Sequence, residues 1–442
     1  MLKTFPKGGI HPAENKITSS KAIKRMPVPK VVYVPIAQHI GIPSEIVVDR
    51  KDKVKKGQVI AKSRGYVSSN IHTPVAGTVT KLDMMVDSSG YKKQCIVIRT
   101  DQKDESNFEA PEFPLKKEIT MDQKEILQHI TDSGIVGLGG ATFPSHVKLD
   151  LKNDNHVDCL IINGVECEPY LTADHRLMLE KADEIIVGIQ ILMHALHIQE
   201  AIIGIENNKK DAIKVLKKAA QVDDRIKIAA LQVKYPQGSE KQLIKAILNR
   251  EVPKGGLPMD IGTIVHNVGT IFAIYQAVQY DLPLIERVVT ITGKKLANPS
   301  NFWVKIGTPI KGLVEEVGGI PEGTRKIVNG GPMMGKAIKN TDVPITKGTS
   351  GILIISEDEA SRQESKNCIR CSNCVFVCPM GLEPHLLMNL SEKGFYERAK
   401  AEDIMTCIEC GSCSYVCPSH RPLLDYIRFG KSVVKKLQTT KN

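Results

Sequence analysis

Eight of the eleven cysteines lie between Cys368 and Cys417, and their spacing is the strongest chemical pattern in the sequence. They form two runs that both read C-x2-C-x2-C-x3-C-P, from Cys368 to Pro379 and from Cys407 to Pro418. Runs of this spacing bind iron–sulfur clusters: three thiolates of a run hold one cluster, and the fourth cysteine reaches the other cluster. We expect the remaining, scattered cysteines to be small buried side chains.

This spacing predicts two [4Fe–4S] clusters with exchanged fourth ligands, which together carry single electrons. One ligand set is Cys368, Cys371, Cys374 and Cys417, and the other is Cys407, Cys410, Cys413 and Cys378. The alternative is a pair of structural zinc sites, although zinc sites usually present paired C-x2-C units.

A second pattern is the glycine loop, "GIVGLGGATFPSHVK", from Gly134 to Lys148. It nearly matches G-x-G-x-x-G, but Thr142 stands where the third glycine is required. A Rossmann loop follows a strand and opens a helix. Here a helix is expected before the loop, where Thr120 and Gln123 have capping-box spacing, and a proline follows it. The context therefore excludes a Rossmann fingerprint.

The elements around these patterns predict an α/β multidomain chain. From residue 157 strands and helices alternate, which indicates a parallel sheet with right-handed crossovers. The expected organisation is an extended N-terminus (1–27), a β barrel-sandwich module (28–102), a linker (103–118), a parallel α/β domain (119–285) to which the resemblance described next assigns flavin and NAD(H) binding, a β-grasp unit (286–345) and a helical di-cluster ferredoxin-like domain (346–442).

Four stretches occur in the order found in a known family: "GLGGATFPSHVK", "LIINGVECEPYLTADHRLML", "YPQGSEKQLI" and "VHNVGT". They resemble the NADH-binding flavoprotein subunit of respiratory complex I, over about residues 120–345. With the N-terminal "GGIHPAENK", the barrel-sandwich module and the two cysteine runs, nearly the whole chain resembles the C subunit of the Rnf ion-translocating electron transport complex.

The resemblance implies a non-covalent FMN and NAD(H) as substrate. It implies that Gly137, Gly139 and Gly140 let the backbone approach FMN closely. It also implies that Lys148 faces the FMN phosphate and that Asn163 hydrogen-bonds the isoalloxazine ring. It places Glu166, the candidate catalytic residue, in the nucleotide cleft with Gly238, Glu240 and a stacking Phe143, and it places Asn267 and Thr270 against the flavin or its phosphate. The sequence departs from the family pattern at Leu138, Thr142, Val165, Ser239, His266 and Gly269.

The function implied is that of a peripheral subunit of a membrane ferredoxin:NAD+ oxidoreductase coupled to Na+ or H+ translocation. No stretch reaches the roughly 18–20 apolar residues that span a bilayer, so we expect contact with the cytoplasmic face of the cell membrane without spanning. The net charge of +11 suits an acidic iron–sulfur partner subunit and anionic lipid, for which "LLDYIRFGKSVVKKL" is a candidate contact. Few aromatic residues argue against nucleic acid.

Two alternatives remain open on the sequence. One is a soluble cobalamin reductase of the propanediol-utilisation type, which resembles the same Rnf subunit. The other is an electron-wire adaptor that has kept the fold and lost the nucleotide site, as the replacements at Leu138, Val165 and Ser239 allow.

Overall fold

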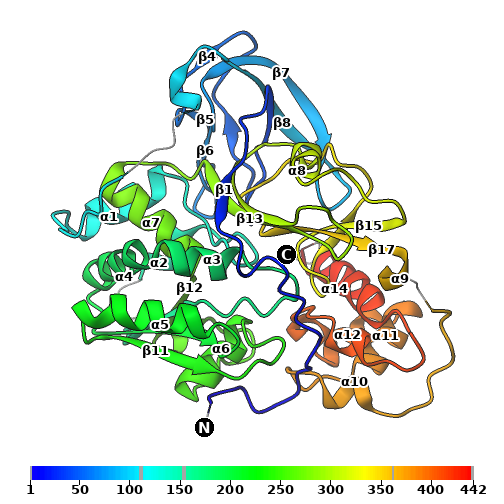
Figure 1. Cartoon of the computed structure of the whole chain (residues 1–442). Coiled ribbons are helices and arrows are strands. Elements are labelled where there is room, and N and C mark those ends of the chain that lie inside the picture. Colours follow the sequence, from blue (N-terminus) through cyan, green and yellow to red (C-terminus); the bar gives the residue numbers. More distant parts are fainter. Residues whose placement is uncertain (1, 109–112, 152–155, 361–362, 440–442) are drawn as a thin grey trace.

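The computed structural model describes residues 2–108, 113–151, 156–360 and 363–439 (Figure 1). Its four parts follow the chain from a β module through a parallel α/β domain and a mixed sheet to a helical cysteine domain. Among the described residues, no helix is both long and apolar enough to cross a lipid bilayer.

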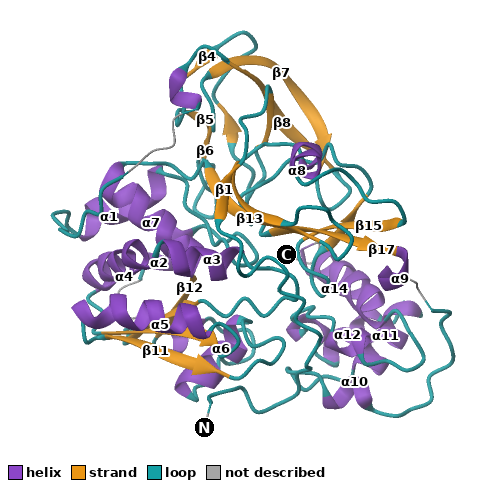
Figure 2. Cartoon of the chain, in the orientation of Figure 1, coloured by secondary structure: helices purple, strands orange, loops and turns teal. Residues whose placement is uncertain are grey.

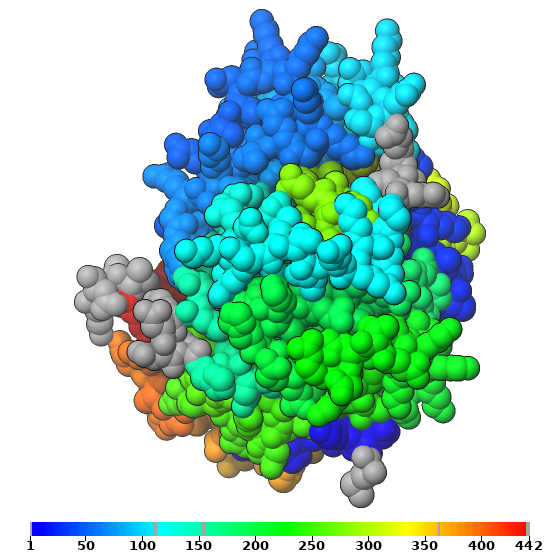
Figure 3. Space-filling model, turned by 90° about the vertical axis from the view of Figure 1, so that its left-hand side faces the viewer, coloured from blue at the N-terminus to red at the C-terminus, as the bar shows by residue number. Residues whose placement is uncertain are grey.

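The barrel-sandwich module consists of two small antiparallel sheets, with strand orders β2-β8-β7-β4 and β3-β5-β6. Apolar residues alternate along its strands, so Val32, Val34, Ile96 and Ile98 point into one fully buried core. Figure 3 shows the module (blue) standing on the parallel domain (cyan to green). The elements are β2 (Val31–Pro35), β3 (Glu45–Ile46), β4 (Lys53–Val54), β5 (Val59–Lys62), β6 (Ile71–His72), β7 (Gly77–Val86), β8 (Lys92–Thr100) and the 3-10 helix η1 (Glu105–Asn107).

The parallel domain has four parallel strands in the order β11-β10-β9-β12. The side chains of α1, α3, α4, α5 and α7 cover one face, and those of α6 cover the other, so the strands are apolar throughout (Figure 2). The elements are α1 (Gln123–Asp132), α2 (Ser145–Leu149), β9 (Cys159–Asn163), α3 (Ala173–Glu180), α4 (Ala182–Leu196), β10 (Glu200–Glu206), α5 (Lys210–Ala219), η2 (Ala220–Val222), β11 (Ile226–Leu231), α6 (Glu240–Leu248), η3 (Pro258–Ile261), β12 (Thr263–Asn267) and α7 (Val268–Tyr280).

Helix α1 does precede the glycine loop, but its cap differs from the predicted one. Asp122 accepts from the backbone of Glu125, and Glu125 accepts from the backbone of Asp122, which completes a capping box two residues after Thr120. Pro144 is the N-cap of the short helix α2, so the loop lies between two helices.

The mixed sheet has the order β1-β14-β13-β17-β15-β16, and it corrects two predicted boundaries. Strand β1 comes from the supposedly extended N-terminus and pairs with β14. Strand β17 lies beyond residue 345, yet it pairs with β13 and β15 in the middle of the sheet. The elements are β1 (Ile23–Arg25), β13 (Glu286–Thr292), β14 (Ser300–Lys305), α8 (Ile310–Glu316), β15 (Thr324–Asn329), β16 (Lys336–Ile338) and β17 (Gly351–Ser356).

The cysteine domain is helical, and the N-terminal segment ties it to the parallel domain. Gly9 N donates to Val377 O (2.9 Å), and Ile10 pairs with Tyr235 through two backbone hydrogen bonds. The elements are α9 (Glu357–Ala360), α10 (Asn373–Phe376), α11 (Pro384–Glu392), α12 (Tyr396–Ala401), η4 (Ile404–Thr406), α13 (Ser412–Tyr415) and α14 (Leu423–Thr439).

Candidate functional site

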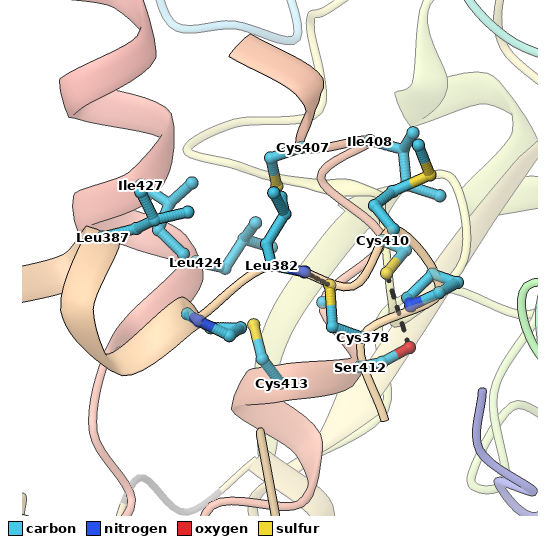
Figure 4. Close-up of a pocket in the computed structure, with 14 residues that line it drawn as sticks. Cys378, Leu382, Leu387, Cys407, Ile408, Cys410, Ser412, Cys413, Leu424 and Ile427 are labelled. Carbon is cyan, nitrogen blue, oxygen red and sulfur yellow. Dashed lines mark hydrogen bonds between the residues drawn. The ribbon is translucent and has the colours of Figure 1, made fainter. Parts of the chain in front are cut away.

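Four of the predicted cluster ligands line a single pocket in the cysteine domain. They are Cys407, Cys410 and Cys413 of the second run and Cys378 of the first (Figure 4). Leu424 and Ile427 of α14 and Leu387 of α11 close the pocket on its apolar side. The structure therefore brings together the predicted set, including the cysteine exchanged between runs.

Two of these sulfurs accept backbone hydrogen bonds, which fits the ligands of an iron–sulfur cluster. Leu382 N donates to the sulfur of Cys378, and Glu409 N donates to the sulfur of Cys407, both at 3.4 Å. Such bonds stabilise negative charge on sulfur and tune cluster potentials. Burial raises the pKa of Cys407 to about 11 and that of Cys413 to about 12. The thiolates that ligate iron therefore require the positive charge of the metal.

The other four cysteines also gather, at a more open place. Burial raises the pKa of Cys374, and the neighbouring thiols of Cys417, Cys368 and Cys371 raise it further. Cys368 and Cys371 are exposed. Within the described ranges, no three His, Cys, Asp or Glu side chains are placed so that they could hold a single metal ion.

The glycine loop lies at the carboxyl edge of the parallel sheet, at the point between β9 and β12 where the order of the strands reverses. From β9 the chain continues to β10 and β11 on one side and returns through α6 to β12 on the other. Asn163 and Asn267, the last residues of β9 and β12, are paired in register. In parallel α/β sheets this switch point is where ligands bind.

The glycine loop packs closely against this edge of the sheet. Leu138 N donates to Thr270 Oγ1 (2.9 Å) near the start of α7. A Cβ on Gly139 would lie 2.8 Å from Asn267, whereas a Cβ on Gly140 would meet no protein atom within 4 Å. Gly137 N donates to Phe143 O (2.9 Å), and a Cβ on Gly137 would lie at an ordinary contact distance of 3.7 Å from that oxygen. The loop thus forms a cradle that is tight at Gly139 and open at Gly140.

A third segment, Tyr235–Glu240, completes the cradle. Asn163 Nδ2 donates to Gly238 O (2.8 Å), and Gly238 N donates to the sulfur of Cys167 (3.4 Å). Burial raises the pKa of Cys167 to about 12, and Glu206 adds to this, so its thiol is unreactive. Phe143 of the glycine loop is 36% exposed, so a stacking ligand has access to it.

Lys148 and Glu240, predicted to serve the phosphate and the nucleotide separately, contact each other. The ammonium of Lys148 donates to Glu240 Oε1 (2.5 Å) and to Val265 O (2.6 Å). Beneath them His266 is buried, and its Nε2 has no hydrogen-bond partner. Burial and the charge of Lys148 lower the pKa of His266 to about 3, so the imidazole is neutral.

Glu166 has a structural role at the start of α3. Its two carboxylate oxygens accept from the backbone of Asp174 (2.8 Å) and His175 (3.1 Å), which satisfies free N–H groups of the helix. Lys16 holds the same loop from the N-terminal segment by donating to the carbonyls of Glu166, Glu168 and Leu171. The catalytic role of Glu166 stays a prediction.

Sequence reasoning missed several charged residues behind the cradle. Burial and the charge of Glu166 raise the pKa of Asp174 to about 7, and Asn267 donates to Asp174 (2.6 Å). Arg287 of β13 is buried and donates to Leu138 O (3.2 Å). Asp174 and Lys16 lie inside stretches that carry the family resemblance, which could have revealed them, but no local pattern marks Arg287.

Models of known domain families match successive parts of the chain. Residues 3–103 match the RnfC barrel sandwich hybrid domain, and residues 130–276 match the Nuo51 FMN-binding domain. Residues 288–337 match the SLBB domain, and residues 360–420 match a 4Fe-4S dicluster domain. These matches confirm the predicted fold class, an FMN-binding domain and a 4Fe-4S domain.

Full-length relatives agree with this order of domains. The C subunit of the proton-translocating ferredoxin:NAD+ oxidoreductase complex of Clostridium ljungdahlii is 48% identical, over 98% of this chain and 94% of the relative. The C subunit of the Na+-translocating ferredoxin:NAD+ oxidoreductase complex of Acetobacterium woodii is 41% identical, over 96% of each chain. The C subunit of the ion-translocating oxidoreductase complex of Rhodobacter capsulatus is 43% identical, over 100% of this chain and 85% of the relative.

A solved structure shares part of the fold. An NAD+-reducing [NiFe]-hydrogenase in the H2-reduced state superposes with a TM-score of 0.52 at 20% identity, over 70% of this chain and 61% of that chain. The identity is low enough that this likeness speaks for the fold alone. The relatives, the domain matches and the two sites together show that this chain belongs to the RnfC family, the C subunits of Rnf-type ion-translocating oxidoreductase complexes.

Proposed function

We propose that this chain is the peripheral electron-transfer subunit of a membrane ferredoxin:NAD+ oxidoreductase coupled to Na+ or H+ translocation. In this proposal it exchanges electrons between NAD(H), a non-covalent FMN and two [4Fe–4S] clusters. The observation that carries the proposal is the segment Tyr235–Glu240, which contacts both sites. Tyr235 donates to the carbonyl of Cys410 (2.8 Å), while Gly238 and Glu240 contact the cradle.

The residues of the cradle fit a flavin phosphate and ring. The open backbone at Gly140, the ammonium of Lys148 and the start of α7 offer donors and positive potential to a phosphate. Lys148 gives up or shares its contact with Glu240 when an anion binds, because one ammonium has three donors. When bound, FMN exchanges electron pairs with a nicotinamide and single electrons with clusters.

The geometry also orders the two cysteine sets. The pocket of Cys407, Cys410, Cys413 and Cys378 adjoins the parallel domain through Tyr235 and Ile10. The set with the exposed Cys368 and Cys371 faces outward. We infer that the first of these sites communicates with the cradle, and the second with other subunits of the complex, one of which carries iron–sulfur clusters.

We further propose that the chain works on the cytoplasmic face of the cell membrane as a peripheral subunit. The net charge of +11 favours acidic protein partners and anionic lipid headgroups. Helix α14 is basic along part of its length and exposes Phe429, which suits contact with a membrane surface or a neighbouring subunit.

The test is anaerobic purification, followed by measurement of iron, sulfide and released flavin, and then by addition of NADH. We expect about eight irons and one FMN per chain, and bleaching of the visible absorbance by NADH. Lys148→Met is expected to lower FMN content, whereas Lys92→Met, an exposed lysine of the barrel-sandwich module, leaves it unchanged. Clusters without flavin or NADH response would favour the adaptor, and reduction of a corrinoid by the isolated chain would favour the cobalamin reductase.

A further inference from the structure

The two cysteine runs fold as an internal repeat, so each position of one loop has a counterpart in the other. Arg370 and Glu409 are counterparts with φ of 56° and 57°, and Ser372 and Gly411 are counterparts with φ of 61° and 78°. Each loop leads into a helix of four residues, α10 or α13, and these helices lie against each other. Differences between the loops therefore reflect their surroundings, since the backbone is alike.

The second loop is covered by the rest of the chain. Ile408 packs in an apolar cluster with Ile10 and Tyr235, and the hydroxyl of Tyr235 bonds to the loop backbone at Cys410. Met333 of the mixed sheet's β15–β16 loop also lies against it, 3.1 Å from where a Cβ on Gly411 would stand. This face of the repeat is thus occupied by the parallel domain and the mixed sheet.

The equivalent face of the first loop is open. Ile369, the counterpart of Ile408, is 68% exposed, and every residue from 363 to 373 is exposed. Phe376 of α10 is 75% exposed, and its counterpart Tyr415 of α13 is 55% exposed, so the contrast between the two loops rests on Ile369 and Ile408. In Figure 1 residues 363–372, which lead into α10 (orange), follow the outer edge of the cysteine domain. Apolar side chains exposed beside two exposed ligand cysteines are typical of a surface that a partner covers.

The two loops also differ in charge. Glu409 of the covered loop is neutralised within the chain, by ion pairs with Arg428 (3.1 Å) and Lys431 (2.8 Å). At the same position the open loop carries an exposed arginine, Arg370, and Lys366 lies shortly before it. Glu364 is the acidic residue of this segment, so its balance is positive. An arginine between exposed apolar side chains suits an acidic partner.

We propose that the open loop, residues 363–376, is the docking surface for an iron–sulfur protein with an acidic face. The inference rests on the proposed function and names the place where electrons enter or leave the chain. With clusters bound, Cys368, Cys371, Cys374 and Cys417 would hold one of them beside this surface, and each transfer would oxidise the donor's cluster by one electron and reduce the acceptor's cluster by one. The counterpart loop shows the kind of cover expected: an apolar contact at Ile369 and a polar contact at Arg370.

The test uses membrane vesicles that hold the other subunits of the complex and lack this chain. Purified chain is added back, and the bound amount is measured across chain concentrations at low and high salt. Arg370→Glu is the main variant, because glutamate already occupies this backbone conformation at Glu409. Phe376→Ser removes the exposed ring. Lys92→Glu and Tyr91→Asp are matched controls on the barrel-sandwich module, where Tyr91 is 72% exposed.

We expect Arg370→Glu to weaken rebinding about tenfold and to remove most of its salt dependence, since a charge pair at an interface is lost. Phe376→Ser is expected to weaken rebinding by about fivefold or more, and the controls rebind like wild type. Iron content and the response of the isolated variants to NADH are measured alongside. If both variants rebind like wild type, the docking surface lies elsewhere. Failure of the wild type to respond to NADH would instead contradict the proposed function and leave the rebinding result standing.

Discussion

Replacement of Gly139 by alanine tests the cradle at its tightest contact. The added Cβ would lie 2.8 Å from Cβ and Nδ2 of Asn267 and 2.9 Å from its Cγ, well inside the usual contact distance of about 3.5–4.0 Å. Asn267 is fixed at both ends, because its amide donates to Asp174 and its Oδ1 accepts from Gly269 N. The loop or the asparagine must therefore move.

The magnitude follows from what each movement breaks. Overpacking by one methyl group costs about 1–3 kcal/mol. Displacement of Asn267 would also remove the N-cap of α7, worth about 1 kcal/mol, and the hydrogen-bond donor to buried Asp174, worth about 1–3 kcal/mol. A single movement relieves the steric overlap, so these free-energy costs do not add in full. We expect the free energy of unfolding of the parallel domain to fall by about 2–3 kcal/mol.

Gly140→Ala is the matched control, since its Cβ would meet no protein atom. The midpoint of thermal unfolding of the flavin-free protein is expected to fall by about 4–10 °C for Gly139→Ala. For Gly140→Ala it should change by no more than about 1–2 °C, which corresponds to about 0.5 kcal/mol. Titration with FMN, followed by quenching of flavin fluorescence, is expected to show about tenfold weaker binding for Gly139→Ala, because Asn267 is a predicted flavin contact. Equal unfolding midpoints for the two variants would refute the reasoning.

Burial raises the pKa of Glu168 to about 7, so the folded chain holds this proton more tightly than the unfolded chain. The free energy of unfolding should therefore fall as pH rises from about 4.5 to 7, by up to about 3 kcal/mol. In a Glu168→Gln variant the unfolding midpoint should depend less on pH between pH 5 and 8. Lys16→Met removes the donor to three loop carbonyls and is expected to cost at least about 2 kcal/mol, seen as faster proteolysis of the N-terminal segment; unchanged cleavage would argue against the contact. Cys378→Ser is expected to halve the iron content and to leave a cluster whose paramagnetic resonance spectrum matches that of Cys407→Ser, whereas a match to Cys371→Ser would contradict the exchanged ligand.

Local sequence patterns were sufficient to predict much of this structure. The grouping of Cys378 with the second run follows from spacing alone, because a short loop and one helical turn fix where each thiolate points. The rejection of a Rossmann loop needed only its neighbours, α1 before it and Pro144 after it. The alternation of strands and helices likewise predicted the parallel sheet, since each element buries its own apolar stripe.

Contacts between distant segments could not be predicted in this way. Strand β17 has an apolar run that fits a buried strand, but its place between β13 and β15 depends on pairing far along the chain. Glu166 matches a family position, yet its bonds to the start of α3 depend on a loop with φ of +46° at that residue. The pairing of Lys148 with Glu240 joins residues whose separate roles were predicted from separate motifs.

The mixed sheet and the barrel-sandwich module act together on the glycine loop. Arg287 donates to the carbonyls of Leu138 and Lys347, and Lys347 donates to the carbonyls of Gly134 (2.6 Å) and Asn70 (2.8 Å). Burial lowers the pKa of Arg287 to about 10 and that of Lys347 to about 7, which shows the cost of keeping cations there. That cost is offset only while the loop carbonyls stay within reach. Two buried basic side chains from one domain therefore fix the start and the middle of a loop in another, so the surrounding domains serve to position the cradle.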